Sequence, residues 1–363
     1  MRVLIVTTVM APYRVALFEN IAKHVDLTVC FEQYRDNTRD DSWYKRETKS
    51  FNSIINENIV YNKFKKTVKS EIKKGYDFVI FYEYSTKLAI NLIFFCQKKN
   101  IPYLINCDGA FIKKNNPIKY YIKSTLIKKA TGLLANGASA IQYFLYYGGT
   151  ENKIYLHDFT SLSELDLKRE KSVNLKDLLL QYNIPRDGKI CLAVGRYIPR
   201  KHFDFLIKLW GKVSPECYLL LVGNGVCNSE YKDLIDKNEH SNIILVNHLN
   251  KEDLFKLYQR GKVLLFPTEN EIWGLVVEEA MSQGMPVIGT IGSNAVSELV
   301  KNGKNGFILS RDNPNEWVNK INEVCLNQDV YEELSEEAFC TVKERTMDNN
   351  ARQIINILDC LSK

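Results

Sequence analysis

The chain has 363 residues, which exceeds the usual size of one hydrophobic core, so two domains are expected. With 45% hydrophobic and 25% charged residues it is neither a disordered nor a membrane-spanning composition, and its longest apolar run, Leu88–Cys96, is too short to cross a bilayer. The net charge of +6 is uneven: residues 1–165 carry 24 Lys/Arg against 15 Asp/Glu (+9) and the remainder 25 against 28 (−3), so the first half is expected to meet something anionic.

The first half alternates short apolar segments with amphipathic ones. Strands are predicted at Arg2–Thr8, Asp26–Phe31, Asp77–Tyr82, Pro102–Asn106, Gly132–Ala135 and Lys153–Leu156. Helices are predicted at Pro12–Lys23 and near residues 62–74, 86–99, 117–130 and 138–146. Strands that alternate with helices predict right-handed crossovers and a parallel, doubly wound sheet.

A second alternation follows a polar, charge-mixed stretch at residues 166–188, which we interpret as a linker between a domain of residues 1–165 and one of 189–342. Its strands are predicted at Ile190–Val194, Cys217–Leu221, Asn242–Val246, Lys262–Phe266, Pro286–Gly289 and Phe307–Leu309. Beyond residue 312 the pattern is helical to the end of the chain, without another strand.

The nine cysteines are scattered, odd in number and lack a Cys-x-x-Cys pair. This pattern indicates reduced thiols in a cytoplasmic protein and argues against a disulfide framework or a zinc site. The apolar start of the chain is also too short for a secretory signal peptide.

The segment 266–280 carries the clearest chemistry. An apolar strand stops at Pro267, a polar loop with Glu271 follows, and Gly274 opens a helix-periodic segment that contains Glu279. A strand, a tight loop and a helix N-terminus place free backbone N–H groups where a phosphate can bind. Because the two carboxylates can accept hydrogen bonds from sugar hydroxyls, the segment suits a nucleotide-sugar.

The Glu-x7-Glu spacing of Glu271 and Glu279 resembles the donor motif of the family-4 retaining glycosyltransferases. Three further segments in the same order resemble other elements of that family: Val194–Lys201, Val222–Gly225 and Ser297–Phe307. Four features in order over residues 190–310 make the match specific. The N-terminal half resembles bacterial capsule and O-antigen glycosyltransferases more loosely, through residues 11–14 and 158–162.

The resemblance implies the GT-B architecture: two facing Rossmann-like α/β domains, with a C-terminal helix (residues 343–363) returning to the first domain. It also implies a catalytic group in the second domain made of Arg196, Lys201 and Glu271, with the two cations on the leaving diphosphate. Arg200 and His202 compete for the same role. The donor-binding positions that it implies are Gly195, Gly223, Ile272, Trp273, Gly274, Leu275 and Glu279.

Each acid also has a simpler interpretation. Glu271 could only complement a helix dipole, and Glu279 could be a solvated helix carboxylate. Apolar neighbours favour a largely buried helix, in which a buried Glu279 needs partners such as a ribose diol. Glu278 points about 100° away around the helix and is expected to be structural or solvent-facing.

On the acceptor side, Arg14 is a candidate contact to an anionic substrate, and Asp108 follows a strand where family members often place a histidine. Asp108 in a turn-forming Asp-Gly is an equally good interpretation. Basic stretches near residues 63–74 and 118–129 are solvated helix faces or sites of attachment to an anionic membrane surface. Nucleic-acid binding is not favoured, because no recognition module is visible.

The sequence therefore predicts a retaining, metal-independent hexosyltransferase that moves sugar from a nucleotide-sugar, with a UDP-sugar favoured, to a bacterial surface-glycan acceptor that is lipid-linked. We expect it to be cytoplasmic and peripheral to the plasma membrane, with no cofactor beyond the co-substrate and no Asp-x-Asp metal motif. A sugar-nucleotide epimerase on the same fold and a catalytically silent binding protein remain alternatives.

Overall fold

The protein was analysed as a computed structural model that describes residues 1–33, 50–114, 116–168, 180 and 182–363. The chain divides into two compact units, which are treated separately below: unit 1 contains residues 1–161 and 345–363, and unit 2 contains residues 162–344. Most of the predicted linker, residues 166–188, lies outside the described residues.

Unit 1 is built on a seven-stranded sheet whose neighbouring strands run parallel, in the order β3-β2-β1-β4-β5-β6-β7. The strands are β1 (Arg2–Thr7), β2 (Asp26–Phe31), β3 (Asn52–Ile55), β4 (Phe78–Phe81), β5 (Tyr103–Cys107), β6 (Gly132–Ala135) and β7 (Ile154–Leu156). The edge strand β3 was not predicted, because its first two residues, Asn52 and Ser53, are polar and interrupt the apolar run that marks the buried strands.

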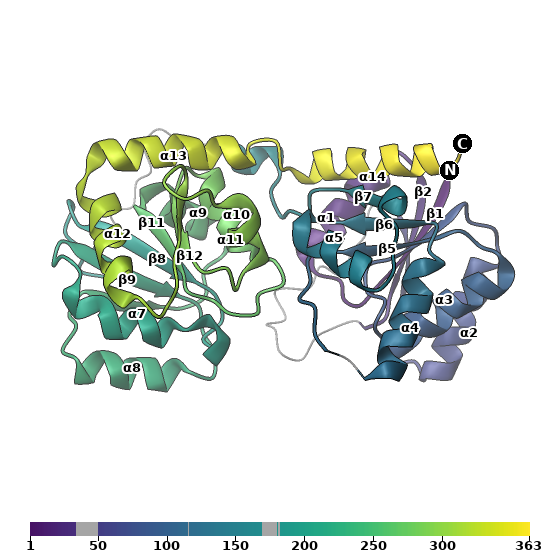
Figure 1. Cartoon of the computed structure of the whole chain (residues 1–363), viewed down its shortest axis with the longest axis horizontal. Coiled ribbons are helices and arrows are strands. Elements are labelled where there is room, and N and C mark those ends of the chain that lie inside the picture. Colours follow the sequence, from purple (N-terminus) through teal and green to yellow (C-terminus); the bar gives the residue numbers. More distant parts are fainter. Residues whose placement is uncertain (34–49, 115, 169–179, 181) are drawn as a thin grey trace. The chain divides into compact units, whose positions relative to one another are not determined.

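Helices cover both faces of this sheet (Figure 1). One face packs against α2 (Tyr61–Ile72), α3 (Lys87–Lys99), α4 (Pro117–Lys128) and α5 (Gly137–Tyr146). The other face packs against α1 (Pro12–Ile21) and the C-terminal helix α14 (Met347–Leu361), which lie side by side. Because every strand except β3 and β7 is largely buried, the sequence shows continuous apolar runs and not an alternation.

Unit 2 contains a six-stranded sheet with parallel neighbours in the order β10-β9-β8-β11-β12-β13. The strands are β8 (Lys189–Val194), β9 (Cys217–Val222), β10 (Ile243–Val246), β11 (Val263–Phe266), β12 (Val287–Gly289) and β13 (Gly306–Ile308). The order reverses between β8 and β11, and ligands of open α/β sheets bind at the carboxyl ends of strands beside such a point.

The helices of unit 2 follow the predicted alternation. They are α7 (Phe203–Leu209), α8 (Asn228–Lys237), α9 (Lys251–Arg260), α10 (Leu275–Ser282), α11 (Asn294–Leu299), α12 (Pro314–Leu326) and α13 (Gln328–Val342), with short 3-10 turns that include η4 (Pro199–Lys201). One face of the sheet packs on α7, α8 and α12. The opposite side carries α9, α10 and α11 (Figure 1).

The predicted fold class is confirmed: two parallel-sheet α/β units are present, and the last helix of the chain packs in the first of them. Thr346 caps α14 with its hydroxyl, and Ile354 and Leu358 are buried in the unit 1 core. Among the described residues, the structure contains no helix that is both long and apolar enough to cross a membrane.

Candidate functional site

Two glycine turns at the carboxyl ends of β8 and β9 pack backbone against backbone. Gly195 and Gly223 have φ values of 151° and 147°, which L side chains rarely adopt. A Cβ on Gly223 would lie 2.0 Å from the carbonyl oxygen of Gly195, so only glycine fits there. Glycine turns at the carboxyl ends of parallel strands are a common place for backbone N–H groups to bind a phosphate.

Lys201 is held under the β8 loop by the 3-10 turn η4. Its backbone N–H donates to the carbonyl of Ile198 at 3.0 Å, and His202 ends the turn with φ 52°. The Lys201 side chain is nearly buried, at 7% exposure for the residue, and its Nζ lies 4.7 Å from the ring centroid of Phe266. Burial lowers the pKa of Lys201, and the nearby Glu271 carboxylate opposes that effect.

Glu271 accepts hydrogen bonds from two cations through the same oxygen. Lys201 Nζ lies 2.7 Å and Arg200 Nη1 lies 2.5 Å from its Oε2. Its backbone N–H donates to the carbonyl of Gly292 at 2.9 Å, which ties the loop to the end of β12. Burial would raise the pKa of Glu271, but Lys201 and Arg200 outweigh it, so the pKa is lowered and the carboxylate stays ionised.

Arg200, one of the two competitors considered from the sequence, occupies the contact with Glu271. Arg196 is solvent-exposed on the loop before η4 and acts electrostatically on Lys201. With Arg196, Arg200 and Lys201 against Glu271, the cluster has a formal charge of +2 (3 − 1). An excess of positive charge at the carboxyl end of the sheet suits a diphosphate.

The N-terminus of α10 lies directly after Glu271. Gly274 precedes the helix with φ 110°, and a Cβ there would lie 3.1 Å from Phe266 and from Ser293 Oγ. The carbonyls of Ile272 and Trp273 accept from Asn294 Nδ2 at 2.8 Å and Ser293 Oγ at 2.6 Å.

The Trp273 indole is buried, whereas the Ile272 side chain is 48% exposed. Leu275 begins the eight-residue helix, whose first N–H groups have no acceptor within the helix itself.

Glu279 is half-buried on α10 and interacts electrostatically with Tyr258 of α9, whose burial raises its pKa. Its neighbour Glu278 is fully buried, at 0% exposure, which excludes the solvent-facing alternative and leaves the structural one. An acid in the first turn of a helix also complements its dipole.

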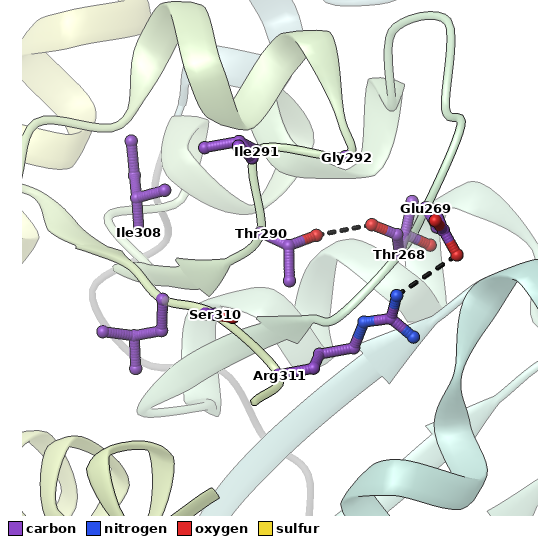
Figure 2. A pocket seen from close by; sticks show the side chains of 9 residues that line it. Thr268, Glu269, Thr290, Ile291, Gly292, Ile308, Ser310 and Arg311 are labelled. Carbon is purple, nitrogen blue, oxygen red and sulfur yellow. Dashed lines mark hydrogen bonds and ion pairs between the residues drawn. The ribbon is translucent and has the colours of Figure 1, made fainter. Parts of the chain in front are cut away.

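A cavity of about 320 Å³ is lined in part by Thr268 and Glu269, at the start of the loop that carries Glu271 (Figure 2). It is lined by the ends of β11, β12 and β13, including Thr268, Thr290 and Ile308. Arg311 Nη2 pairs with Glu269 Oε2 at 3.2 Å across its mouth. The lining includes neither Lys201 nor Glu271, but it includes Gly292, whose carbonyl accepts from the Glu271 N–H, and Glu269, whose N–H donates to the Arg200 carbonyl.

In unit 1, the predicted acceptor residues Arg14 and Asp108 form a buried ion pair through Arg14 Nη2. Asn106 Nδ2 donates to the second oxygen of Asp108 at 2.8 Å. Asp108 outweighs the effect of burial, so the pKa of Arg14 is raised and its charge is retained. The pair lies at the carboxyl end of β5, beside the first turn of α1.

Four buried polar atoms near this pair have no hydrogen-bond partner among the described residues. They are Arg14 Nη1, Tyr82 Oη, Asn106 Oδ1 and His157 Nε2. Arg14 is 6% exposed, and its guanidinium stacks 4.6 Å from the Tyr82 ring. Buried polar atoms are normally satisfied, so this group is prepared for a polar ligand.

Glu83 follows β4 in the same region and was missed from the sequence. Burial and the nearby carboxylates of Asp108 and Glu32 raise its pKa to about 7, against the effect of Arg14. The signal in the sequence was an acid directly after an apolar strand, at the sheet edge that binds ligands. A carboxyl group that titrates near neutral pH can accept or donate a proton.

Residues 178–339 match the family described as Glycosyl transferases group 1. An uncharacterised glycosyltransferase of Methanocaldococcus jannaschii is 27% identical over 63% of this chain and 65% of its own length. The capsular polysaccharide biosynthesis glycosyltransferase CapM of Staphylococcus aureus is 27% identical over 51% of this chain and 49% of its own length. The alignments thus span between about half and two thirds of these curated relatives.

Among solved structures, HepE of Anabaena in complex with UDP superposes with a TM-score of 0.83 at 16% identity, covering 99% of this chain and 100% of that one. The same protein has also been solved with UDP-glucose. The chain therefore has the GT-B fold, and its sequence resembles group 1 glycosyltransferases that include capsule enzymes. The predicted family resemblance is confirmed; the individual site residues stay predictions.

Proposed function

We propose that the protein is a retaining glycosyltransferase that uses a UDP-sugar. The observation that carries this proposal is the cluster that Arg200 and Lys201 form with Glu271. Helix α10 begins shortly after Glu271 in the chain, and Glu279 lies about one turn into that helix. The solved complexes of HepE with UDP and UDP-glucose support the choice of nucleotide.

The proposed donor occupies unit 2 in three parts. Backbone at Gly195, Gly223 and Gly274 approaches the diphosphate, and the Glu279 carboxylate accepts from the ribose hydroxyls. Lys201 and the two neighbouring arginines neutralise the charge that gathers on the leaving UDP. Glu271 accepts hydrogen bonds from the sugar hydroxyls, and it fixes Lys201 by the 2.7 Å contact.

In the proposed reaction, the bond between the anomeric carbon and the diphosphate oxygen breaks, and a bond to the acceptor oxygen forms on the same face. The acceptor hydroxyl's proton passes to the departing diphosphate. We expect no divalent cation to be required, because the cluster already contains three side-chain cations. A chelator that abolished turnover would contradict this part of the proposal.

Unit 1 is proposed to bind a glycan acceptor through the polar group around Arg14 and Asp108. Because Asp108 already neutralises Arg14, the remaining hydrogen-bonding atoms suit hydroxyl groups better than a free anion. The names of relatives such as CapM support a bacterial surface glycan, and a lipid-linked form of it is part of the proposal.

A membrane contact is proposed for α4. Ile118 and Tyr121 are 73% and 72% exposed, and Lys113, Lys114 and Lys119 are exposed beside them. Apolar side chains interleaved with cations suit the interface of an anionic bilayer, where each cation contributes ~1 kcal/mol. We therefore propose a cytoplasmic protein that attaches peripherally to the membrane that holds its acceptor.

The test is to incubate the purified protein with a panel of UDP-sugars, beginning with UDP-glucose, and to measure UDP release and the donor that remains. Slow UDP release that glycan acceptors stimulate would support transfer. A donor returned as its epimer would instead establish an epimerase, and a failure to bind any nucleotide-sugar would establish a silent binding protein.

A further inference from the structure

Three cysteines far apart in the sequence converge in the core of unit 2. Cys191 lies on β8, Cys217 begins β9, and Cys325 is near the end of α12. The register pairs Lys189 with Cys217 and Cys191 with Leu219, so alternation puts the side chains of Cys191 and Cys217 on one face of the sheet. That face packs against α12, which supplies the third thiol.

The three sulfur atoms lie within 4.8 Å of one another, and the Sγ atoms of Cys191 and Cys325 are 3.4 Å apart. All three residues are buried, at 0%, 0% and 3% exposure. A cation that lies in the plane of three sulfurs, with bonds of about 2.3 Å, would hold these sulfurs about 4.0 Å apart. The separation of 3.4 Å and the upper bound of 4.8 Å are both within 1 Å of this value, so small side-chain adjustments would complete the coordination.

We propose that Cys191, Cys217 and Cys325 form a binding site for one thiophilic cation of the zinc or cadmium type. Binding a divalent cation releases three protons and leaves a complex of charge −1. Lys189 acts electrostatically on Cys217 and Lys262 on Cys325, so two positive charges lie close enough to offset that charge. Sulfur ligands and a dry, apolar surrounding select soft cations over magnesium or calcium.

The site is structural and not part of the donor site. Cys217 is the first residue of β9 and Cys191 the third of β8, whereas the charged cluster lies beyond the carboxyl ends of the strands. The cation would join β8, β9 and α12, which form one side of the unit 2 core. The cysteine pattern argued against a zinc site at the level of sequence, because the spacings of 26 and 108 residues match no metal-binding pattern and arise only from the fold.

The test uses cadmium as the probe and the full chain in which the two exposed cysteines are replaced, Cys340→Ser and Cys360→Ser. After refolding with cadmium under a thiol-free reductant and desalting, we expect one retained cadmium per chain and a sulfur-to-cadmium charge-transfer band. X-ray absorption at the cadmium edge should give three sulfur neighbours. Cadmium at a hundred times its Kd should raise the Tm by about 5–10 °C.

Cys217→Ser in the same background should abolish retention, whereas Cys96→Ser, a buried cysteine of unit 1, should leave it unchanged. If a serine variant fails to fold, the sulfur count in the background protein decides the question. No retained cadmium, fewer than three sulfur neighbours, or a disulfide between Cys191 and Cys325 under these conditions would overturn the proposal. Retention that is equal in the Cys217 variant would overturn it as well.

Discussion

Replacing Lys201 with methionine tests the charge argument most directly. Methionine retains most of the side-chain length and packing on Phe266, and it removes the ammonium that lies 2.7 Å from Glu271. A cation fixed in a nearly dry site stabilises developing charge by about 3–4 kcal/mol, which corresponds to a fall in kcat of about 10²–10³. Because the UDP charge develops in the transition state, the KM for the UDP-sugar should change little.

The fold should tolerate this change. Removing one partner of a buried ion pair costs roughly 3–5 kcal/mol when the other charge is left alone. Here Arg200 remains 2.5 Å from the same oxygen of Glu271, so we expect a smaller loss of stability.

The assay is steady-state UDP release with and without acceptor, together with a thermal melt. Lys208→Met is the matched control, because Lys208 is an exposed lysine of α7 that forms a surface ion pair with Asp204 at 2.8 Å. Lys208→Met should leave kcat unchanged. A Lys201 variant with full kcat and only a raised KM would refute the assignment of Lys201 to the leaving group. Equal losses in the two variants would refute it too.

Three other changes have defined outcomes. The pKa of Glu83 is about 7 in the folded chain against an ordinary 4.5, so the free energy of unfolding falls as the pH rises through that interval. Glu83→Gln should remove this fall, which is at most about 3 kcal/mol. Urea melts from pH 5 to 8 measure it. An unchanged slope would contradict the burial of Glu83. Gly223→Ala places a Cβ 2.0 Å from the Gly195 carbonyl, so UDP binding measured by calorimetry should fall at least tenfold; wild-type affinity would show that the loop is not tight. Replacing Ile118 and Tyr121 together by serine should weaken sedimentation with anionic vesicles but not UDP release, and equal sedimentation would remove α4 as the membrane contact.

The fold followed from the sequence because buried parallel strands leave continuous apolar runs. Segments such as Val263–Phe266 are apolar at every position, and the helices between them have a clear period. The exception, β3, is a half-exposed edge strand whose polar residues face solvent, so burial did not constrain its composition. Helix α14 was predicted as a helix from its period, but its return to the first unit came from the family resemblance.

The segment proposed to bind the donor could also be predicted from the sequence, because its glycines and acids act through local backbone geometry. Gly274 and Glu271 are only three residues apart, and the turn that relates them is encoded by their own segment. The partner of Glu271 was harder to assign. One loop carries three cations, Arg196, Arg200 and Lys201. The 3-10 turn brings Arg200 and Lys201 to the carboxylate and leaves Arg196 exposed to solvent.

Unit 1 was less predictable for a different physical reason. Arg14 comes from the first turn of α1, and Tyr82, Asp108 and His157 directly follow β4, β5 and β7, so no local spacing relates them. Their pattern exists only after the sheet has formed. The same holds for the three thiols of unit 2, which are joined by tertiary packing alone. Local sequence motifs therefore identify sites that depend on backbone geometry. Sites formed by side chains from distant segments can be recognised only in the folded structure.

This difference bears on where substrate specificity should be sought. The donor contacts proposed for unit 2 use backbone amides and a few charges, which would bind a diphosphate and a ribose whatever sugar is attached. The unit 1 group instead offers hydrogen-bonding atoms in fixed positions, and a site built to hydrogen-bond a hydroxyl rejects ligands that lack it by large factors. Substituting Tyr82 by phenylalanine should therefore change the preference among acceptors while UDP release without acceptor stays constant. A loss of that basal UDP release, with unaltered acceptor preference, would place Tyr82 in the support of the fold and not in recognition.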